Sequence, residues 1–183
     1  MSGAVTHQPT LLQEHPPGSL VMRNFLFHRV NPKREKLWDP MDVALFDRCI
    51  QHITSKYTVV LLEDFLLSGT VKRGIRYATI MFDDGYKDNL EYAFPILEKY
   101  KCKASFYVVT DCIDQNKPTW THVLETLFEQ TAVNEIDLHL DCLPENMRVQ
   151  CLTGPEERLR YAAELKPYLK SLPSVQRQIV LDR

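Results

Sequence analysis

The chain has 183 residues, of which 44% are hydrophobic and 25% are charged, and its formal net charge is −2. These values are ordinary for a folded protein with one sizeable core. The balanced charge argues against nucleic-acid binding, which usually requires a strongly basic surface. The sequence contains no apolar run that is long enough to cross a membrane.

The N-terminus and the cysteines give two further expectations. Residues 1–19 are polar, contain several prolines and lack the order of a signal peptide, so we expect a flexible leader before one folded unit at 20–183. The five cysteines are odd in number and show no CxxC spacing. This pattern favours reduced thiols in a cytoplasmic protein over a disulfide framework or a zinc ribbon.

The first 110 residues alternate between predicted strands and predicted helices. Apolar runs rich in β-branched or aromatic residues indicate strands at 20–28, 57–61, 77–82 and 104–110. Helical spacing of apolar residues predicts helices at 40–55, 62–68 and 89–100. Pro40 opens the first of these helices, because proline suits the first helical turn. The alternation predicts an α/β fold with a largely parallel sheet.

Beyond residue 110 the pattern is mainly helical. We expect a helix at 119–130 and a short peripheral strand at 136–140. From Pro155 onward, apolar residues recur at helical spacing, and Pro167 and Pro173 interrupt the pattern. No internal linker divides the chain into two domains.

The segment TIMFDDGYKDN, at 79–89, places two carboxylates directly after a buried strand. Ligands of α/β sheets bind beyond the carboxyl ends of the strands, where successive side chains point in opposite directions. We therefore expect different roles for Asp83 and Asp84, one binding a cation and the other accepting a proton, while Gly85 allows a sharp turn. The structural alternative is that one Asp caps the turn and the other is solvated.

The sequence around these carboxylates resembles that of a known family. FDDGYKDN followed by AFPILEKYKCKASFYVVT is similar in residues and spacing to the first motif region of the polysaccharide deacetylases (the NodB homology domain, carbohydrate esterase family 4). FLFHRV upstream and NKPTWTHVLETLF downstream resemble segments of one branch of that family. The resemblance covers about residues 20–130 and corresponds to the N-terminal part of the domain.

The resemblance implies a fold, a reaction and roles for particular residues. The fold would be a partial or distorted (β/α) barrel whose C-terminal strands are missing. The reaction would be the metal-dependent removal of N-acetyl groups from a sugar or polysaccharide, with zinc as the expected metal. Asp83 would be the general base, Asp84 a metal ligand, and Tyr86 a residue beside the substrate.

Two further residues are candidates with structural alternatives. His28 ends the first predicted strand and could face the same crevice as Asp84, near the metal, but a histidine in such a place is often only a hydrogen-bonded structural residue. Trp120 could bind the sugar, although an aromatic residue on an amphipathic helix is often part of the core.

One motif of the family has no match in this sequence. The metal-binding histidines of the family occur as H-[ST]-x-x-H, and none of the six histidines here has that spacing. The expectation from the sequence is that the chain is truncated, or is a pseudoenzyme, and that it is a poor catalyst.

The sequence therefore predicts a hydrolase of carbohydrate metabolism that acts on an N-acetylated saccharide. The alternative is a non-catalytic remnant of the fold that binds a carbohydrate or a protein partner. A third possibility, an acidic Mg²⁺ pocket of a phosphotransfer domain, leaves the HRV and FYVV segments unexplained. Nucleotide binding has no support, because the glycines form neither GxGxxG nor a P-loop.

Overall fold

A parallel sheet centred on β3 (Arg76–Phe82) organises the first half of the chain in the computed structural model, which describes residues 21–67 and 72–183. β1 (Val21–Phe27) pairs with β3 along its whole length. On the other edge of β3, β2 (Thr58–Val59) pairs near its start and β4 (Ser105–Phe106) pairs at its end. The predicted α/β fold with a parallel sheet is confirmed, whereas the predicted leader at 1–19 lies outside the described residues.

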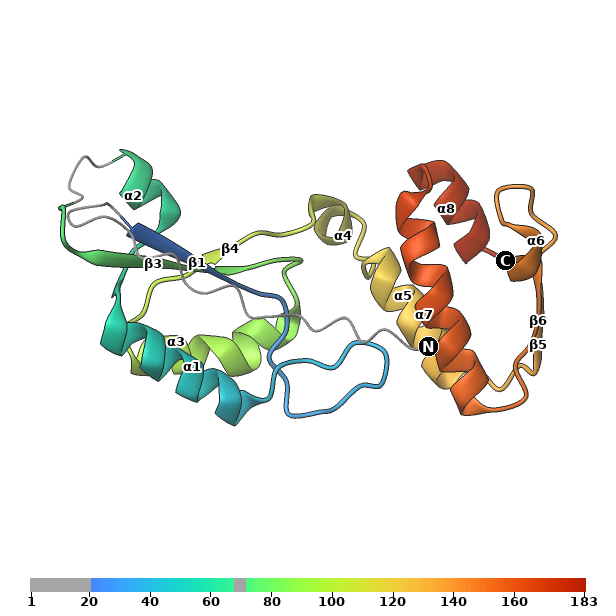
Figure 1. Ribbon diagram of the computed structural model, residues 1–183, viewed down its shortest axis with the longest axis horizontal. Coiled ribbons are helices and arrows are strands. Elements are labelled where there is room, and N and C mark those ends of the chain that lie inside the picture. Colours follow the sequence, from blue (N-terminus) through green and yellow to red (C-terminus); the bar gives the residue numbers. More distant parts are fainter. Residues whose placement is uncertain (1–20, 68–71) are drawn as a thin grey trace, which may run out of the picture.

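Helix α1 (Val43–Lys56) covers one face of this sheet (Figure 1). The helix begins after Asp42, whose side chain accepts a hydrogen bond from the backbone N–H of Leu45 at 2.9 Å, so the predicted start at Pro40 is three residues early. Phe46, Ile50 and Ile53 recur at helical spacing and are buried against the sheet.

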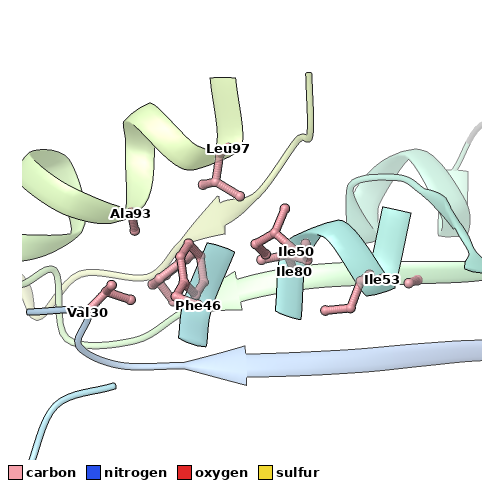
Figure 2. Close-up of a cluster of buried hydrophobic side chains, with 9 residues drawn as sticks. Val30, Phe46, Ile50, Ile53, Ile80, Ala93 and Leu97 are labelled. Atoms are coloured by element: carbon pink, nitrogen blue, oxygen red, sulfur yellow. The ribbon is translucent and has the colours of Figure 1, made fainter. Parts of the chain in front are cut away.

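The core on this face consists of apolar side chains from the sheet and from two helical segments. Alternate residues of β3 point into it, and Figure 2 shows Ile80 of β3 close to Ile50 of α1, with Ala93 and Leu97 in the same cluster. The nine buried members are Val30, Phe46, Ile50, Ile53, Ala78, Ile80, Phe82, Ala93 and Leu97.

The other face of the sheet is less apolar. Thr79 is buried there, and its hydroxyl donates a hydrogen bond to the side-chain oxygen of Asn24 on β1 at 2.9 Å. Short helix α2 (Leu62–Leu67) brings the ring of Phe65 against Tyr77, with centroids 5.6 Å apart. The hydrogen bond satisfies the buried hydroxyl of Thr79, while Asn24 itself is exposed.

The helix predicted at 89–100 divides into two parts. Its first turn is a π-helix, η1 (Asn89–Ala93), and only α3 (Phe94–Lys99) is regular. Pro95, in the first turn of α3, has no N–H to donate to the carbonyl of residue 91, so the chain widens before it. Periodicity alone did not distinguish this π-turn from an α-helix.

The strand predicted at 104–110 is much shorter than expected. β4 ends at Phe106, after which only the N–H of Tyr107 reaches the sheet, donating to the carbonyl of Phe82 at 2.8 Å. β3 itself ends at Phe82, so the residues that follow have no strand to pair with. Thr110 instead begins a short helix, α4 (Thr110–Asp114).

The second half of the chain forms a mainly helical lobe beside the sheet (Figure 1). Its helices are α5 (Trp120–Gln130), α6 (Glu145–Arg148), α7 (Pro155–Ser171) and α8 (Ser174–Leu181). The predicted strand at 136–140 is β5 (Glu135–Asp137), which pairs antiparallel with an unpredicted partner, β6 (Val149–Cys151). A second apolar core, with Phe128, Leu165 and Leu169 among its members, holds these elements together.

The prediction that Pro167 interrupts the C-terminal helical segment was wrong. Pro167 lies inside α7, and only Pro173, which precedes α8, separates two helices. A proline in a helix interior removes one hydrogen bond and usually bends the helix. Here the buried contacts of Leu165 and Leu169, on either side of Pro167, keep the helix packed against the second core.

The five cysteines are free thiols in the structure. Burial raises the pKa of Cys102 to about 11, so this thiol stays protonated at neutral pH. In the described part of the chain, no helix is both long enough and apolar enough to span a membrane.

Replacing Phe46 by Ala tests the sheet core. Phe46 is fully buried and packs edge-to-face against Phe27. We expect the Phe46→Ala change to lower the free energy of unfolding by about 3–5 kcal/mol through the lost contacts and the cavity. Urea unfolding followed by circular dichroism measures this, with Leu45→Ala as the control, since Leu45 is its neighbour on α1 and is 41% exposed. Equal losses in the two variants would contradict the core assignment.

Candidate functional site

A tight turn at the end of β3 carries the two predicted carboxylates. The backbone N–H of Asp83 donates to the carbonyl of Phe27 at 3.0 Å, which fixes the turn to the end of β1. Asp84 has φ 71° and Gly85 φ 72°, a left-handed pair that Asp tolerates better than most residues and that glycine adopts freely. The turn reverses the chain and leaves both carboxylates beyond the carboxyl end of the sheet.

His28 meets this turn from the end of β1. Its Nε2 lies 4.0 Å from Oδ2 of Asp83, and the two side chains are 41% and 40% exposed. The pair is therefore in contact with water and at the limit of ion-pair distance. The ends of two adjacent parallel strands thus bring His28 and Asp83 together.

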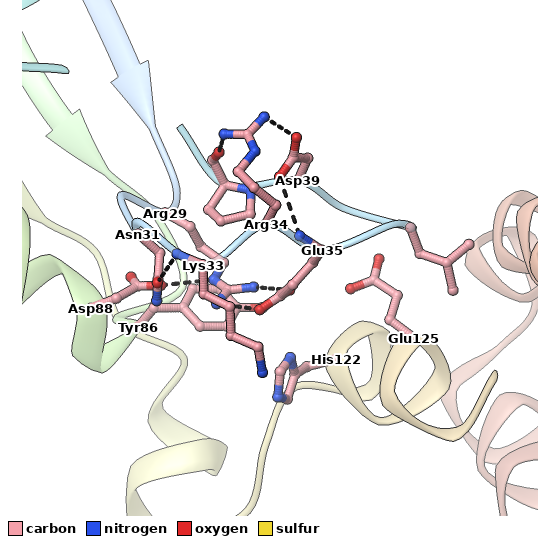
Figure 3. Close-up of polar contacts among 12 residues, drawn as sticks. Arg29, Asn31, Lys33, Arg34, Glu35, Asp39, Tyr86, Asp88, His122 and Glu125 are labelled. Atoms are coloured by element: carbon pink, nitrogen blue, oxygen red, sulfur yellow. Dashed lines mark hydrogen bonds and ion pairs between the residues drawn. The ribbon is translucent and has the colours of Figure 1, made fainter. Parts of the chain in front are cut away.

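A buried arginine, Arg29, follows His28 in the chain. The guanidinium of Arg29 donates to Asp88 at 2.9 Å and forms two hydrogen bonds with Glu35 at 2.5 and 3.0 Å (Figure 3). Burial disfavours the charge of Arg29, but hydrogen bonds and charges from Glu35 and Asp88 outweigh this effect and raise the pKa of Arg29 above its ordinary value. Arg29 thus joins β1, the loop at 31–42 and the start of η1.

Aromatic rings extend this cluster toward the helical lobe. Arg29 lies over the rings of Tyr86 and Trp38, at 5.0 and 5.9 Å from their centroids, and these two rings meet edge-to-face at 5.6 Å. Trp38 also contacts the ring of His28 at 5.6 Å. The hydroxyl of Tyr86 lies 3.1 Å from that of Thr119, the N-cap residue of α5.

The ring of Tyr86 is held in place rather than free. Burial raises the pKa of the Tyr86 phenol, and the negative charge of Asp84 acts in the same direction against the opposing hydrogen bond with Thr119. The phenol therefore stays neutral at physiological pH. Tyr86 packs behind Trp38 and is not among the residues that line the adjacent cleft.

A cleft of about 1000 Å³ lies between the sheet turn and the helical lobe. His28, Asp84 and Trp120, three of the five predicted site residues, line it, and Trp38 stands beside them. Asp83 lies next to the cleft through its contact with His28. The volume is at the upper end of the range for small-ligand sites, which suits an extended ligand.

The donor atoms of the cleft do not by themselves fit a resident zinc ion. Zinc accepts imidazole and carboxylate ligands, and His28 and Asp84 supply one of each. Within residues 21–67 and 72–183, however, no group of three or more histidine, cysteine, aspartate or glutamate side chains is arranged to hold a metal. The predicted ligand roles of Asp84 and His28 thus stay predictions.

Sequence reasoning missed several residues of the cleft. Trp38 lies in a charged loop with no periodic pattern, and Lys170 and Arg177 belong to helices far along the chain. Arg29 and Asp88 could have been noticed, because both lie in segments that resemble the family, FLFHRV and FDDGYKDN. Their pairing across 59 residues could not be read from either segment alone.

Comparison with known proteins finds sequence similarity around this site. The family model for polysaccharide deacetylases matches residues 70–139, which include the Asp83–Asp84 turn. The chain is 25% identical over 122 residues to YxkH of Bacillus subtilis, which bears a polysaccharide deacetylase name. That match covers 67% of this chain and 40% of YxkH, so the chain spans about two fifths of the length of this relative.

Solved structures of deacetylases show weaker likeness. The deacetylase PplD of Streptococcus pyogenes, in complex with acetate, gives a TM-score of 0.46 at 20% identity, covering 62% of this chain and 61% of PplD. IcaB of Ammonifex degensii gives 0.43 at 19% identity, covering 88% of this chain and 79% of IcaB. The sequence matches, not these scores, show that part of the chain is similar to polysaccharide deacetylases.

Replacing Gly85 by Ala tests the turn at the end of β3. A Cβ at residue 85 would lie 2.8 Å from Cγ1 of Val108, whereas a Cβ at Gly74, which also has positive φ, would meet nothing within 4 Å. Both Ala variants incur the left-handed strain of about 1–2 kcal/mol, and the clash adds about 1–3 kcal/mol for Gly85→Ala only. Thermal unfolding of both variants measures the difference.

A second substitution checks the cause of that difference. Val108→Ala removes the clashing atom, so the double variant Gly85→Ala/Val108→Ala should recover most of the stability that Gly85→Ala loses beyond Gly74→Ala. A double variant as unstable as the sum of its single changes would show that contact with Val108 is not what requires glycine at this turn.

Replacing Arg29 by Met tests the buried network. The change leaves the carboxylate of Asp88, only 6% exposed, without its cationic partner. We expect a loss of about 3–5 kcal/mol in the free energy of unfolding. Arg34→Met is the control, since Arg34 pairs with Asp39 at the surface and such pairs contribute at most about 1 kcal/mol. Similar losses in the two variants would mean that the buried network adds nothing beyond a surface pair.

Proposed function

We propose that this chain forms the substrate cleft of a polysaccharide deacetylase and supplies its general base. The observation that supports this most directly is the convergence of His28, Asp84 and Trp120 on one cleft, with Asp83 4.0 Å from His28. The match of residues 70–139 to the family adds the reaction class. The substrate is an N-acetylated sugar or polysaccharide, and the reaction is hydrolysis of its acetamide bond.

Asp83 is the proposed base. Amide hydrolysis needs a group that takes a proton from the attacking water, and a half-exposed carboxylate at the edge of the cleft can do this while staying in contact with solvent. The hydrogen bond from the N–H of Asp83 to the carbonyl of Phe27 keeps the carboxylate in place during the reaction. His28 lies beside it, with its Nε2 4.0 Å from the carboxylate.

Asp84 and His28 are the cleft residues that would face a divalent metal, but these two donors do not by themselves fit a resident zinc ion, so no proposed step depends on one. Two protein donors hold zinc weakly, so we expect slow turnover by the 183-residue chain. The step that this chain's own residues support is proton transfer from the attacking water to Asp83.

The experiment that tests the proposal measures acetate released from an N-acetylated chito-oligosaccharide with zinc added. We expect slow release by the parent chain and a reduction of about 10²-fold or more in Asp83→Asn, which keeps the shape and removes the base. Asp111→Asn is the matched control, because Asp111 also lines the cleft but lies on α4, away from the turn after β3. Release that is equal in parent and Asp83→Asn, or absent from both, would contradict the assignment.

A further inference from the structure

The wall of the cleft opposite the sheet turn carries cations that the proposed hydrolysis does not use. Lys166 and Lys170 of α7 and Arg177 of α8 line this wall, and we call these three residues the cationic wall. The carboxylates Asp84 and Asp111 line the side of the cleft that faces the sheet. The charges of the cleft are thus largely segregated between the two lobes.

One member of the cationic wall is already paired. Lys166 forms an ion pair with Glu125, a buried residue of α5, and its ammonium lies 5.5 Å from the centroid of the Trp38 ring. Its charge is compensated and its position is fixed by these two contacts. Lys166 therefore joins the two sides of the cleft and is not available to a ligand.

The other two members of the wall have no carboxylate partner among the residues that the structure describes. Arg177 places its guanidinium 4.8 Å from the centroid of the Trp120 ring, which orients the group and leaves its N–H donors free of other side chains. Asp182 also lines the cleft, but its carboxylate accepts a hydrogen bond from Gln178 at 2.7 Å. Lys117, the remaining cation, donates to Gln115 at 2.7 Å.

Arg177 also changes the expected role of Trp120. The guanidinium lies over the indole ring, so that face of the ring is not open for stacking against a sugar. The tryptophan positions a cation in the cleft, and this cation is the group that a ligand would meet. A planar guanidinium binds an oxyanion with two parallel hydrogen bonds, and a lysine adds a point charge.

We propose that the cleft selects an acetamido saccharide that carries an oxyanion, a carboxylate or a phosphate, and that Lys170 and Arg177 bind this group. The inference rests on the proposed function, since it places the acetamido group of the same ligand toward Asp83 and Asp84. A neutral sugar would leave the exposed Lys170 and the partly buried Arg177 without an anionic partner in the cleft. Lys170 and Arg177 therefore determine specificity and take no part in the hydrolysis.

Three monosaccharides that differ only at carbon 6 test the proposal: N-acetylglucosamine, its 6-phosphate and its 6-carboxylate. Their binding is measured by tryptophan fluorescence, because the chain has two tryptophans, Trp38 and Trp120, and both line the cleft. We expect the two anionic sugars to bind about tenfold more tightly than the neutral one. Added salt should weaken the binding of the anionic sugars and leave that of the neutral sugar unchanged.

Variants locate the preference. Lys170→Gln/Arg177→Gln should reduce the tenfold preference to near one without changing the affinity for the neutral sugar, and Arg177→Lys, which keeps the charge, should retain part of it. Arg160→Gln is the control, because Arg160 is an exposed cation of α7 that does not line the cleft. Circular dichroism of each variant checks that it is folded.

Each result decides the proposal separately from the acetate assay. Equal affinity for neutral and anionic sugars would overturn the oxyanion site and leave the deacetylase proposal standing. A preference that survives in the double variant would place the oxyanion elsewhere and overturn the roles of Lys170 and Arg177. If none of the three sugars binds, both the oxyanion site and the saccharide cleft are wrong. A preference for the 6-phosphate alone or the 6-carboxylate alone supports the site and identifies its anion.

Discussion

The buried guanidinium of Arg29 is the interaction on which the arrangement of the site depends. A cation at this depth is stable only if carboxylates compensate it, and Glu35 and Asp88 do so from two different segments. Satisfying one charge therefore fixes the end of β1, the loop at 31–42 and the start of η1 relative to one another. The rings of Tyr86 and Trp38 pack against the same guanidinium. The position of Trp38 in the cleft therefore depends on Arg29.

The loop at 31–42 transmits this constraint to the helical lobe. The backbone N–H groups of Lys36 and Leu37 donate to the carboxylate of Glu129 on α5, at 2.9 and 3.1 Å. Trp38, the next residue, lies between His28 on one side and the ammonium of Lys166 on the other. The cleft is thus bounded by a loop that is held at both ends by charged groups. The two apolar cores are separate, and the loop contacts the helical lobe both through these hydrogen bonds and through Leu37, which packs against the second core.

Sequence patterns predicted those helices and strands that depend on nearby residues or that pack against the sheet core. The apolar run of β3 and the spacing of Phe46, Ile50 and Ile53 on α1 were enough to predict the strand, the helix and the parallel sheet. The end of β4 depends instead on where β3 stops, and the continuity of α7 through Pro167 depends on contacts with the second core. The same limit applies to the site. The turn with Asp83 and Asp84 is a local motif, whereas Lys170 and Arg177 reach the cleft only through the packing of the helical lobe.

The two lobes contribute different kinds of side chain to the cleft, carboxylates from the side of the sheet and mainly cations from the helical lobe. Side chains at the carboxyl ends of β1 and β3 are fixed by the sheet, so they suit a reaction that needs a base in one position. The helices of the second lobe present long cationic side chains, which tolerate variation in the ligand while still favouring one charge. The loop at 31–42 and the contact between Tyr86 and Thr119 join the two parts in place of a continuous core, so changes to α7 and α8 can alter the cationic wall without changing the core that supports the turn with Asp83.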